Sequence, residues 1–270
     1  MDSGFLGPLG PVSRLTLGGG GLGQLWGQTD RPECIATLRA AVDAGIDLID
    51  LAYRYGEGEA EEVFGAAFEG RVPNGVRVTS KCLLGNTPAD QIEARLRQSI
   101  HDSLARLRVE RLDLFFLHSN VAPDGHAMQQ HPDAGARMTA QSDFVATVRP
   151  CFERFVAEGL IGAWGLTGIG HPDAIIELLA SQPKPAVVQC IANAMDSPGA
   201  LKFYEEPARP RDIIAAAQAN GVGVMGIRAV QAGALTDAID RDLPDDHGEV
   251  RDFNKAGAYR ALAAELGMTA

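Results

Sequence analysis

Residues 45–62 read GIDLIDLAYRYGEGEAEE, and this stretch decides how the chain is built. Residues 46–51 are apolar apart from two aspartates, which predicts a buried strand. Residues 60–68 return to the helical spacing of apolar side chains. Asp50 ends the predicted strand, and Tyr55 follows five residues later, in the turn before the helix. The stretch therefore predicts one strand–turn–helix unit with polar groups at its turn.

The same unit repeats in both directions along the chain. Apolar segments that suit a parallel sheet covered on both faces alternate with segments of helical period, and this alternation predicts an α/β barrel of the (β/α)8 TIM type. The expected strands are 15–17, 46–51, 76–80, 112–117, 163–166, 186–190 and 222–227, and the expected helices are 31–44, 60–68, 88–107, 144–158, 172–180 and 211–219. Residues 120–142 and 232–254 are expected to be long loops after strands, where barrel enzymes build their sites.

Length and charge limit the class of protein. With 270 residues and 46% hydrophobic content, residues 1–270 are expected to form a single domain. The net charge of -11 argues against nucleic acid or an anionic membrane as a partner, because both repel an acidic surface. The expected partner is a small molecule.

The spacing of the cysteines and histidines bears on the cellular compartment and on whether the chain binds a metal. The four cysteines form no CxxC pair, and the chain begins with neither a secretory signal nor a membrane-spanning run, so we expect a cytoplasmic protein. His126 and His131 are five residues apart without a cysteine and carboxylate set around them, which is a poor zinc signature. No metal site is predicted.

Proton-handling groups gather at the ends of three consecutive predicted strands. Asp50 ends the second strand with Tyr55 in the following turn, Lys81 ends the third, and His118 ends the fourth. Each one alone is more simply a capping or solvated strand-end residue. Together they favour an active site, because a barrel brings the carboxyl ends of its strands to one mouth.

The chemistry of these four residues is coherent. A phenol is a poor acid at neutral pH unless a nearby cation stabilises its phenolate, and Lys81 can supply that cation with Asp50 as its ion-pair partner. His118 could donate a hydrogen bond to a substrate carbonyl oxygen. A proton donor beside a carbonyl needs a hydride source, and no side chain provides hydride, so a nicotinamide cofactor is implied.

At these residues the sequence resembles the aldo-keto reductases. Their GxxxxDxAxxYG segment is matched by Gly45, Asp50, Ala52, Tyr55 and Gly56. The resemblance continues through Lys81, LFFLHS, GLIGAWGLTG at 159–168 and VVQC. It implies that Asp50, Tyr55, Lys81 and His118 form a catalytic tetrad, with the tyrosine as general acid and base. The activity it implies is NAD(P)-dependent interconversion of a small aldehyde or ketone, sugar-like and pyridoxal-like carbonyls included, and its alcohol.

The resemblance also implies contacts to the cofactor, with departures. Thr167 and Gly168 stand where many relatives have Ser-Asn, so the hydroxyl is kept and the amide is lost. Gln189 matches a carboxamide contact, and Arg228 is expected either at a phosphate or substrate or in a loop salt bridge. The expected cofactor is NADP, with NAD open. Trp26 and Phe203 are expected in the apolar wall of the substrate pocket, and Trp164 in the core.

The C-terminal part departs most from the family pattern. Relatives continue past the segment resembling YRALAAELGMTA into a helix, an eighth strand and a loop that grips the adenosine phosphate. The sequence therefore predicts either a barrel that lacks its last βα unit or a chain whose tail is omitted.

Two alternatives stay open on the sequence. Gly18, Gly20 and Gly23 spell GxGxxG, the fingerprint of a Rossmann dehydrogenase, although LWGQTDRP separates them from the next helix; in a barrel they shape the loop beside the substrate pocket. The second alternative is a non-catalytic barrel that binds nucleotide and regulates, since a fold does not fix an activity.

Overall fold

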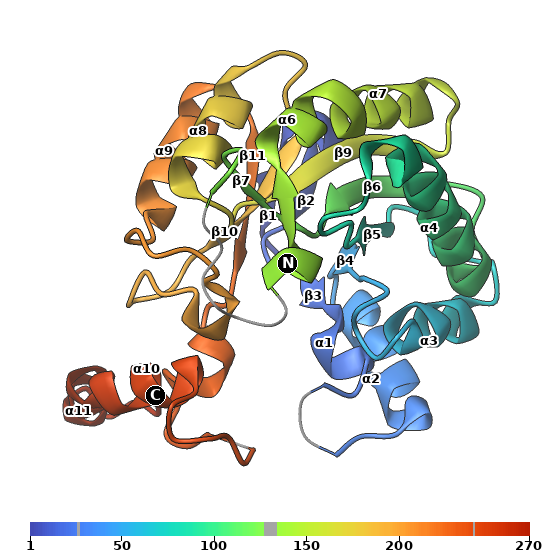
Figure 1. Cartoon of the computed structure of the whole chain (residues 1–270). Coiled ribbons are helices and arrows are strands. Elements are labelled where there is room, and N and C mark those ends of the chain that lie inside the picture. Colours follow the sequence, from blue (N-terminus) through green and yellow to red (C-terminus); the bar gives the residue numbers. More distant parts are fainter. Residues whose placement is uncertain (26–27, 127–133, 240) are drawn as a thin grey trace.

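A computed structural model describes residues 1–25, 28–126, 134–239 and 241–270 (Figure 1). Trp26 and His131 lie outside the described residues. Seven strands form one parallel sheet in which spatial order follows chain order. The strands are β3 (Leu17–Gly18), β4 (Leu48–Asp50), β5 (Arg77–Cys82), β6 (Leu112–Leu117), β9 (Ile161–Thr167), β10 (Val187–Ile191) and β11 (Gly223–Ile227). The predicted strands are thus all present, with ends shifted by a few residues.

This strand order separates the two enzyme folds considered from the sequence. A Rossmann sheet reverses its strand order at a switch point, whereas these strands run from β3 to β11 without reversal. The sheet is the curled, seven-stranded part of a (β/α)8 barrel, so the Rossmann alternative is wrong. Leu17 and Gly18 pair with β4 on one edge, and β11 pairs with β10 on the other. In the part of the chain that the structure describes, no eighth strand joins these edges.

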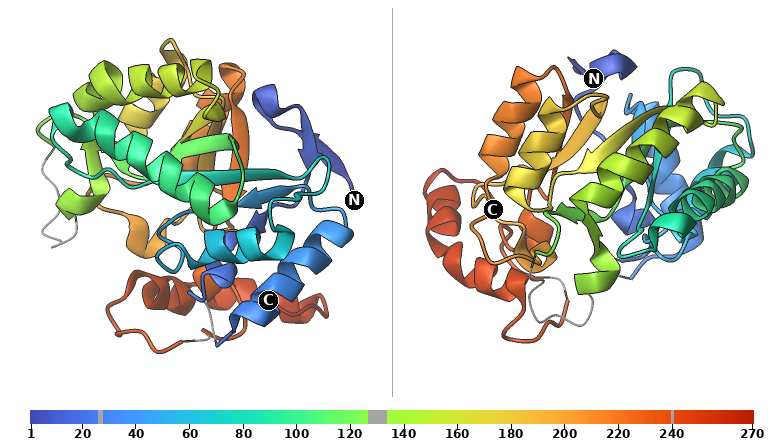
Figure 2. Two further views of the ribbon diagram at one scale, coloured as in Figure 1. Left: turned by 90° about the vertical axis from the view of Figure 1, so that its right-hand side faces the viewer. Right: turned by 45° about the horizontal axis from the view of Figure 1, so that its top comes forward.

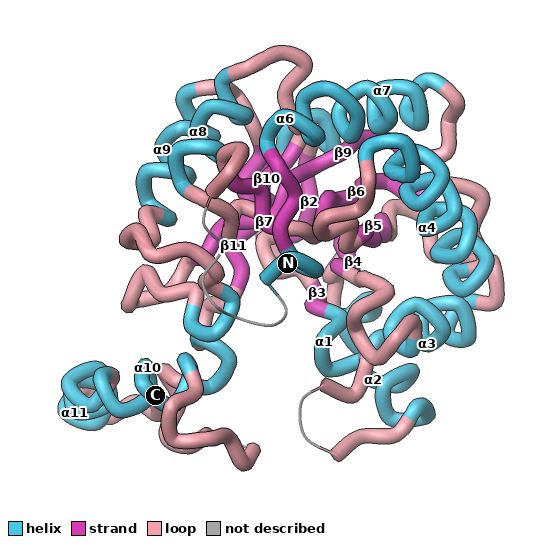
Figure 3. The backbone as a smooth tube through the Cα atoms, viewed as in Figure 1, coloured by secondary structure: helices cyan, strands magenta, loops and turns pink. Residues whose placement is uncertain are grey.

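Helices cover the outer face of the sheet (Figures 2 and 3). Asp30 caps the first long helix by accepting a hydrogen bond from the amide of Glu33, and Pro172 and Pro210 start two others, where a missing N–H costs nothing. The outer helices are α2 (Arg31–Asp43), α3 (Glu59–Phe68), α4 (Ile92–Leu107), α7 (Arg149–Ala157), α8 (Pro172–Ala180) and α9 (Pro210–Ala219). All six were predicted.

The side chains of each strand alternate between two cores, as the pleat requires. On β6, Phe115 and Leu117 point outward into the large core beneath the helices, where Trp164 is also buried, as predicted. Leu114 and Phe116 point into the smaller core inside the curled sheet. An antiparallel hairpin of β1 (Ser3–Phe5) and β2 (Pro11–Ser13) packs against this inner core. The hairpin covers the end of the sheet away from the strand carboxyl ends.

Two predicted loops contain regular structure. Residues 120–142 include a parallel pair, β7 (Asn120–Ala122) and β8 (Met138–Ala140), with α5 (Ala134–Arg137) and α6 (Gln141–Asp143). Residues 232–254 include most of α10 (Gly248–Lys255), which precedes α11 (Gly257–Glu265). Both predictions of pure loop were wrong, because these short elements depend on contacts with distant segments rather than on their own periodicity.

The remaining elements are short. They are α1 (Gly19–Leu22), η1 (Gly7–Leu9), η2 (Ala89–Gln91), η3 (Phe144–Val148), η4 (Gly199–Leu201) and η5 (Gln231–Gly233). α10 contacts η4 and η5, so it lies beside the loops that follow β10 and β11. No helix within the described ranges is long and apolar enough to cross a bilayer.

Candidate active site

Three of the four strand-end residues form one chain of contacts inside the curled sheet. The ammonium of Lys81 donates to Asp50 Oδ2 at 2.9 Å, to the carbonyl of Leu51 at 2.8 Å and to the hydroxyl of Tyr55 at 3.1 Å. All three ammonium hydrogens are thereby used, which fixes the lysine in one position. Because the Tyr55 oxygen accepts from Lys81, its own proton stays available for another acceptor.

Asp50 is supported from two further strands. The hydroxyl of Thr79 donates to Asp50 Oδ1 at 2.7 Å, and the side-chain amide of Gln189 donates to the same oxygen at 2.8 Å. Gln189 was predicted as a cofactor contact, and its side-chain nitrogen lies against this carboxylate. The carboxylate is thus held on both oxygens next to Lys81.

Burial and charge set the protonation of the phenol and the amine. Burial raises the pKa of Tyr55 above its ordinary value, against the opposing charge of Lys81. Burial by itself would lower the pKa of Lys81, but Asp50 and Tyr55 reverse this and raise it. At neutral pH the site therefore contains a protonated phenol beside a charged ammonium.

His118 completes the group at the end of β6. Its ring meets the Tyr55 ring edge-on, with 5.8 Å between centroids. Burial lowers the pKa of His118 well below its ordinary value, and the charges of Lys81, Arg54 and Arg137 lower it further. The imidazole is therefore neutral, and its buried Nδ1 has no hydrogen-bond partner among the described residues.

The glycine-rich loop after β3 packs directly on Tyr55. A Cβ on Gly23 would lie 2.4 Å from the Tyr55 carbonyl oxygen, and one on Gly56 would lie 2.4 Å from the Gly23 carbonyl oxygen. Gly56 also has a φ of +71°. Only glycine allows the two backbones this close. Gly23, the last glycine of the GxGxxG match, thus packs against Tyr55, which gives it a packing role in the barrel.

A small pocket opens beside His118. Thr167 lies in its wall, and its buried hydroxyl has no hydrogen-bond partner among the residues that the structure describes. Phe203 contributes to the apolar wall of the pocket, whereas Trp26 lies outside the described residues. The lining residues are Arg54, Leu83, His118, Asn120, Arg137, Thr167, Ile169, Leu201 and Phe203.

Arg228 lies apart from this pocket. Its guanidinium pairs with the buried carboxylate of Glu249 on α10 and donates to Gln231 Oε1 at 2.9 Å. This is the loop salt bridge that the sequence left open.

Sequence reasoning missed the two arginines of the pocket. Arg54 directly precedes Tyr55, so its place beside the motif was a usable signal. Arg137 belongs to α5, which has no sequence signature, and only the pairing of β7 with β8 brings it to the pocket.

Comparisons with known proteins agree with the fold. The pattern of the aldo/keto reductase family matches residues 14–270. The aldo-keto reductase YhdN of Bacillus subtilis is 36% identical over 115 residues, which are 40% of this chain and 34% of that protein. The chain thus aligns with about a third of the length of this relative.

Solved structures give the same result. A putative aldo-keto reductase from Pseudomonas aeruginosa is 28% identical, with a TM-score of 0.59 over 82% of this chain and 75% of that one. An aldo-keto reductase from Klebsiella pneumoniae in complex with NADPH is 21% identical, with a TM-score of 0.65 over 100% of this chain and 78% of that one. Together with the curled barrel and the segment from Gly45 to Gly56, these matches show that the chain belongs to the aldo/keto reductase family.

Proposed function

We propose that this protein is an NADP-dependent oxidoreductase that interconverts a small aldehyde or ketone and its alcohol. The observation that carries the proposal is the contact chain from Asp50 through Lys81 to the Tyr55 hydroxyl, next to a neutral His118 at a pocket. A purely binding barrel has no need of a buried ammonium aimed at a phenol. The four buried, unpaired cysteines fit a reducing cytoplasm, where we place the enzyme.

Each protein group has a defined part in the reduction. His118 is neutral, so it can donate one hydrogen bond to the carbonyl oxygen without giving up a charge. Tyr55 donates its proton to the oxygen as negative charge develops there. Lys81 lies 3.1 Å from the phenol oxygen and stabilises the phenolate that remains. In the oxidation the phenolate takes the proton back from the alcohol.

Two side chains at the pocket support the binding of a nicotinamide there. Thr167 offers a buried hydroxyl without a partner among the described residues, and a carboxamide can satisfy such a group. Gln189 is anchored on Asp50 nearby and can complete the contact. The bound nicotinamide supplies the hydride. The structural neighbour from Klebsiella pneumoniae binds NADPH, which supports NADP as the cofactor, with NAD as the second choice.

A cofactor titration tests the proposal. We expect NADPH to quench protein fluorescence from Trp26 and Trp164 with saturation, and NADH to bind more weakly. Turnover of a panel of aldehydes should follow in the same protein. Saturable binding without any turnover would favour the non-catalytic, nucleotide-binding barrel instead, and no binding of either cofactor would contradict both proposals.

The charge of the pocket points to a class of substrate. Arg54 and Arg137 both line it beside His118, and among the described residues neither forms an ion pair; Arg137 stacks over the Phe203 ring at 5.5 Å. In a chain of net charge -11, two guanidiniums at one pocket form a local positive site. We therefore propose that the carbonyl substrate carries a carboxylate or phosphate.

Succinic semialdehyde and its methyl ester test this charge preference, because they differ in the anionic group. We expect kcat/KM to be higher for the acid, and Arg137→Met to lower it about 10- to 100-fold, since a charged hydrogen bond contributes about 1.5–3 kcal/mol. Arg137→Met should change kcat/KM for the ester little. The exposed Arg71 supplies the matched control, Arg71→Met. Equal losses for acid and ester would contradict the charge preference while leaving the oxidoreductase proposal intact.

A further inference from the structure

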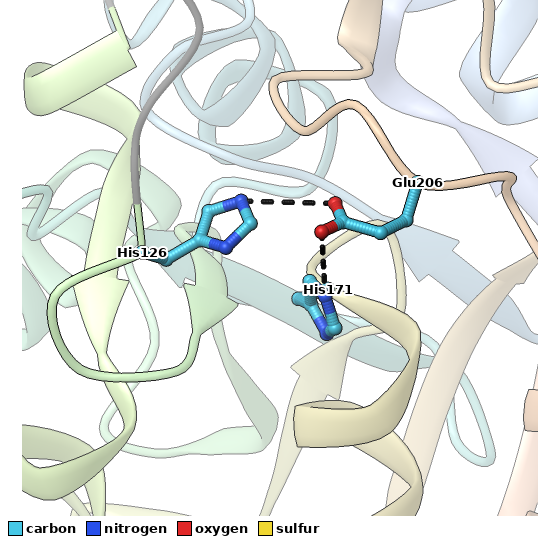
Figure 4. Close-up of side chains that lie close together, drawn as sticks. All are labelled: His126, His171 and Glu206. Atoms are coloured by element: carbon cyan, nitrogen blue, oxygen red, sulfur yellow. Dashed lines mark ion pairs between the residues drawn. The ribbon is translucent and has the colours of Figure 1, made fainter.

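A second cluster of chemically active side chains lies near the pocket and has no part in the proposed reaction. His126 follows β7, His171 immediately precedes α8, and Glu206 lies between η4 and α9 (Figure 4). Their ligand atoms all lie within 4.8 Å of one another. The two imidazoles point toward the same carboxylate from two sides, as the close-up shows.

The distances in this cluster exceed those of hydrogen bonds. His126 Nε2 lies 3.9 Å from Glu206 Oε2, and His171 Nε2 lies 3.7 Å from Glu206 Oε1. An N–H···O hydrogen bond is about 2.7–3.2 Å long. Two ligand atoms that each bind a tetrahedral zinc ion at about 2.0–2.1 Å are about 3.3 Å apart. The two histidine–carboxylate separations are a few tenths of an ångström wider than this. The ligand atoms of the three residues all lie within 4.8 Å of one another, so side-chain rotations must draw them together around an ion.

The histidines are buried without satisfying their nitrogens. The side chain of His126 is 14% exposed and that of His171 is 9% exposed. His126 Nε2, the nitrogen that faces Glu206, is buried and has no hydrogen-bond partner among the described residues. His171 turns its Nε2 toward Glu206, and its other nitrogen, Nδ1, is also buried without a partner there. Such groups lose their hydration without compensation, which is unfavourable. A cation bound between the three side chains would satisfy His126 Nε2 and neutralise the Glu206 carboxylate.

The backbone holds the three segments in place. The His171 amide donates to the Val121 carbonyl at 2.8 Å, and Gly170 is so close to Val121 that a Cβ would lie 2.4 Å from its carbonyl oxygen. Asn120 donates to the Leu201 carbonyl at 3.2 Å, which joins β7 to the loop that carries Glu206. His171 is thus anchored to β7 at the start of α8, while His126 and Glu206 lie on the loops that follow β7 and η4.

We propose that His126, His171 and Glu206 bind one divalent transition-metal ion of the zinc type. Two imidazoles and one carboxylate suit zinc better than calcium or magnesium, which take oxygen ligands. A water molecule would fill the fourth position. The ion joins three segments that also form the pocket wall, because Ile169 lies two residues before His171 and Phe203 three before Glu206. Its role is to fix this wall.

Metal titration of the untagged, chelator-treated full chain tests the proposal. We expect zinc to bind with one ion per chain by calorimetry, to raise the melting temperature, and to be displaced by a chelator. Magnesium should neither bind nor raise the melting temperature. Bound cobalt should show the visible absorption of a four-coordinate ion. His171→Gln and Glu206→Gln should each weaken zinc binding about tenfold or more, because each removes one of three protein ligands.

The controls separate this site from other histidines and from misfolding. His101 is exposed on α4, so His101→Gln should leave zinc binding unchanged. The Glu206 side chain is 49% exposed, so Glu206→Gln should have the same melting temperature as the metal-free native protein. The proposal is overturned if the native chain binds no zinc, or if His101→Gln weakens binding as much as the cluster variants do. Neither result bears on the cofactor titration, so the two proposals fail separately.

Discussion

Tyr55→Phe should lower kcat by about 10²–10⁴-fold while leaving the Kd for NADPH nearly unchanged, because it removes the proton donor alone. The ring remains, and with it the packing on Gly23 and the edge-on contact with His118. Only the hydroxyl that accepts from Lys81 is lost. Steady-state kinetics with the best aldehyde, together with a fluorescence titration of the cofactor, measure both quantities.

Tyr53 provides the matched control for this experiment. Its side chain is exposed and its ring lies 5.0 Å from the Arg106 guanidinium, away from the contact chain. Tyr53→Phe should therefore keep both turnover and cofactor binding. If Tyr55→Phe turned over at the native rate, Tyr55 could not be the general acid, and the assignment of the site would have to be abandoned.

Lys81→Met should abolish turnover and also destabilise the fold by about 3–5 kcal/mol, because it leaves the buried carboxylate of Asp50 without its cation. Lys81 is 1% exposed and Asp50 is 6% exposed, so water cannot replace the lost partner. Urea unfolding followed by circular dichroism measures the free energy of unfolding, and the aldehyde assay measures turnover.

A double variant separates the two effects of this lysine. Asp50→Asn combined with Lys81→Met removes both charges, so part of the lost stability should return while turnover stays absent. Lys255→Met, at an exposed position of α10, controls for the loss of any lysine. Full stability in the single variant Lys81→Met would show that the Asp50–Lys81 pair is not the buried ion pair described above.

Much of the fold follows from local pattern. The β6 and α8 boundaries agree with the predicted ranges, and the other long elements shift by a few residues at their ends, because strands and helices this regular carry their own periodicity. β7, β8 and α10 were not predicted. Short elements such as these form only where distant segments offer hydrogen bonds and apolar surface, which a single sequence does not display.

The sequence by itself determined the barrel and the meeting of Asp50, Tyr55, Lys81 and His118. These residues end or follow consecutive strands, and consecutive parallel strands are neighbours in a barrel, so position along the chain fixes position in space. The order of strand, turn and helix along the chain was sufficient to predict that these four residues meet.

Only the tertiary structure decided the remaining features. It placed the Gln189 amide on Asp50, the Arg228 guanidinium on Glu249, Arg137 at the pocket, and His126 beside His171 and Glu206. All of these lie on loops or across the sheet from their partners. Their separations are set by how long loops pack over a common scaffold, and that packing depends on contacts between residues far apart in the sequence rather than on any local period.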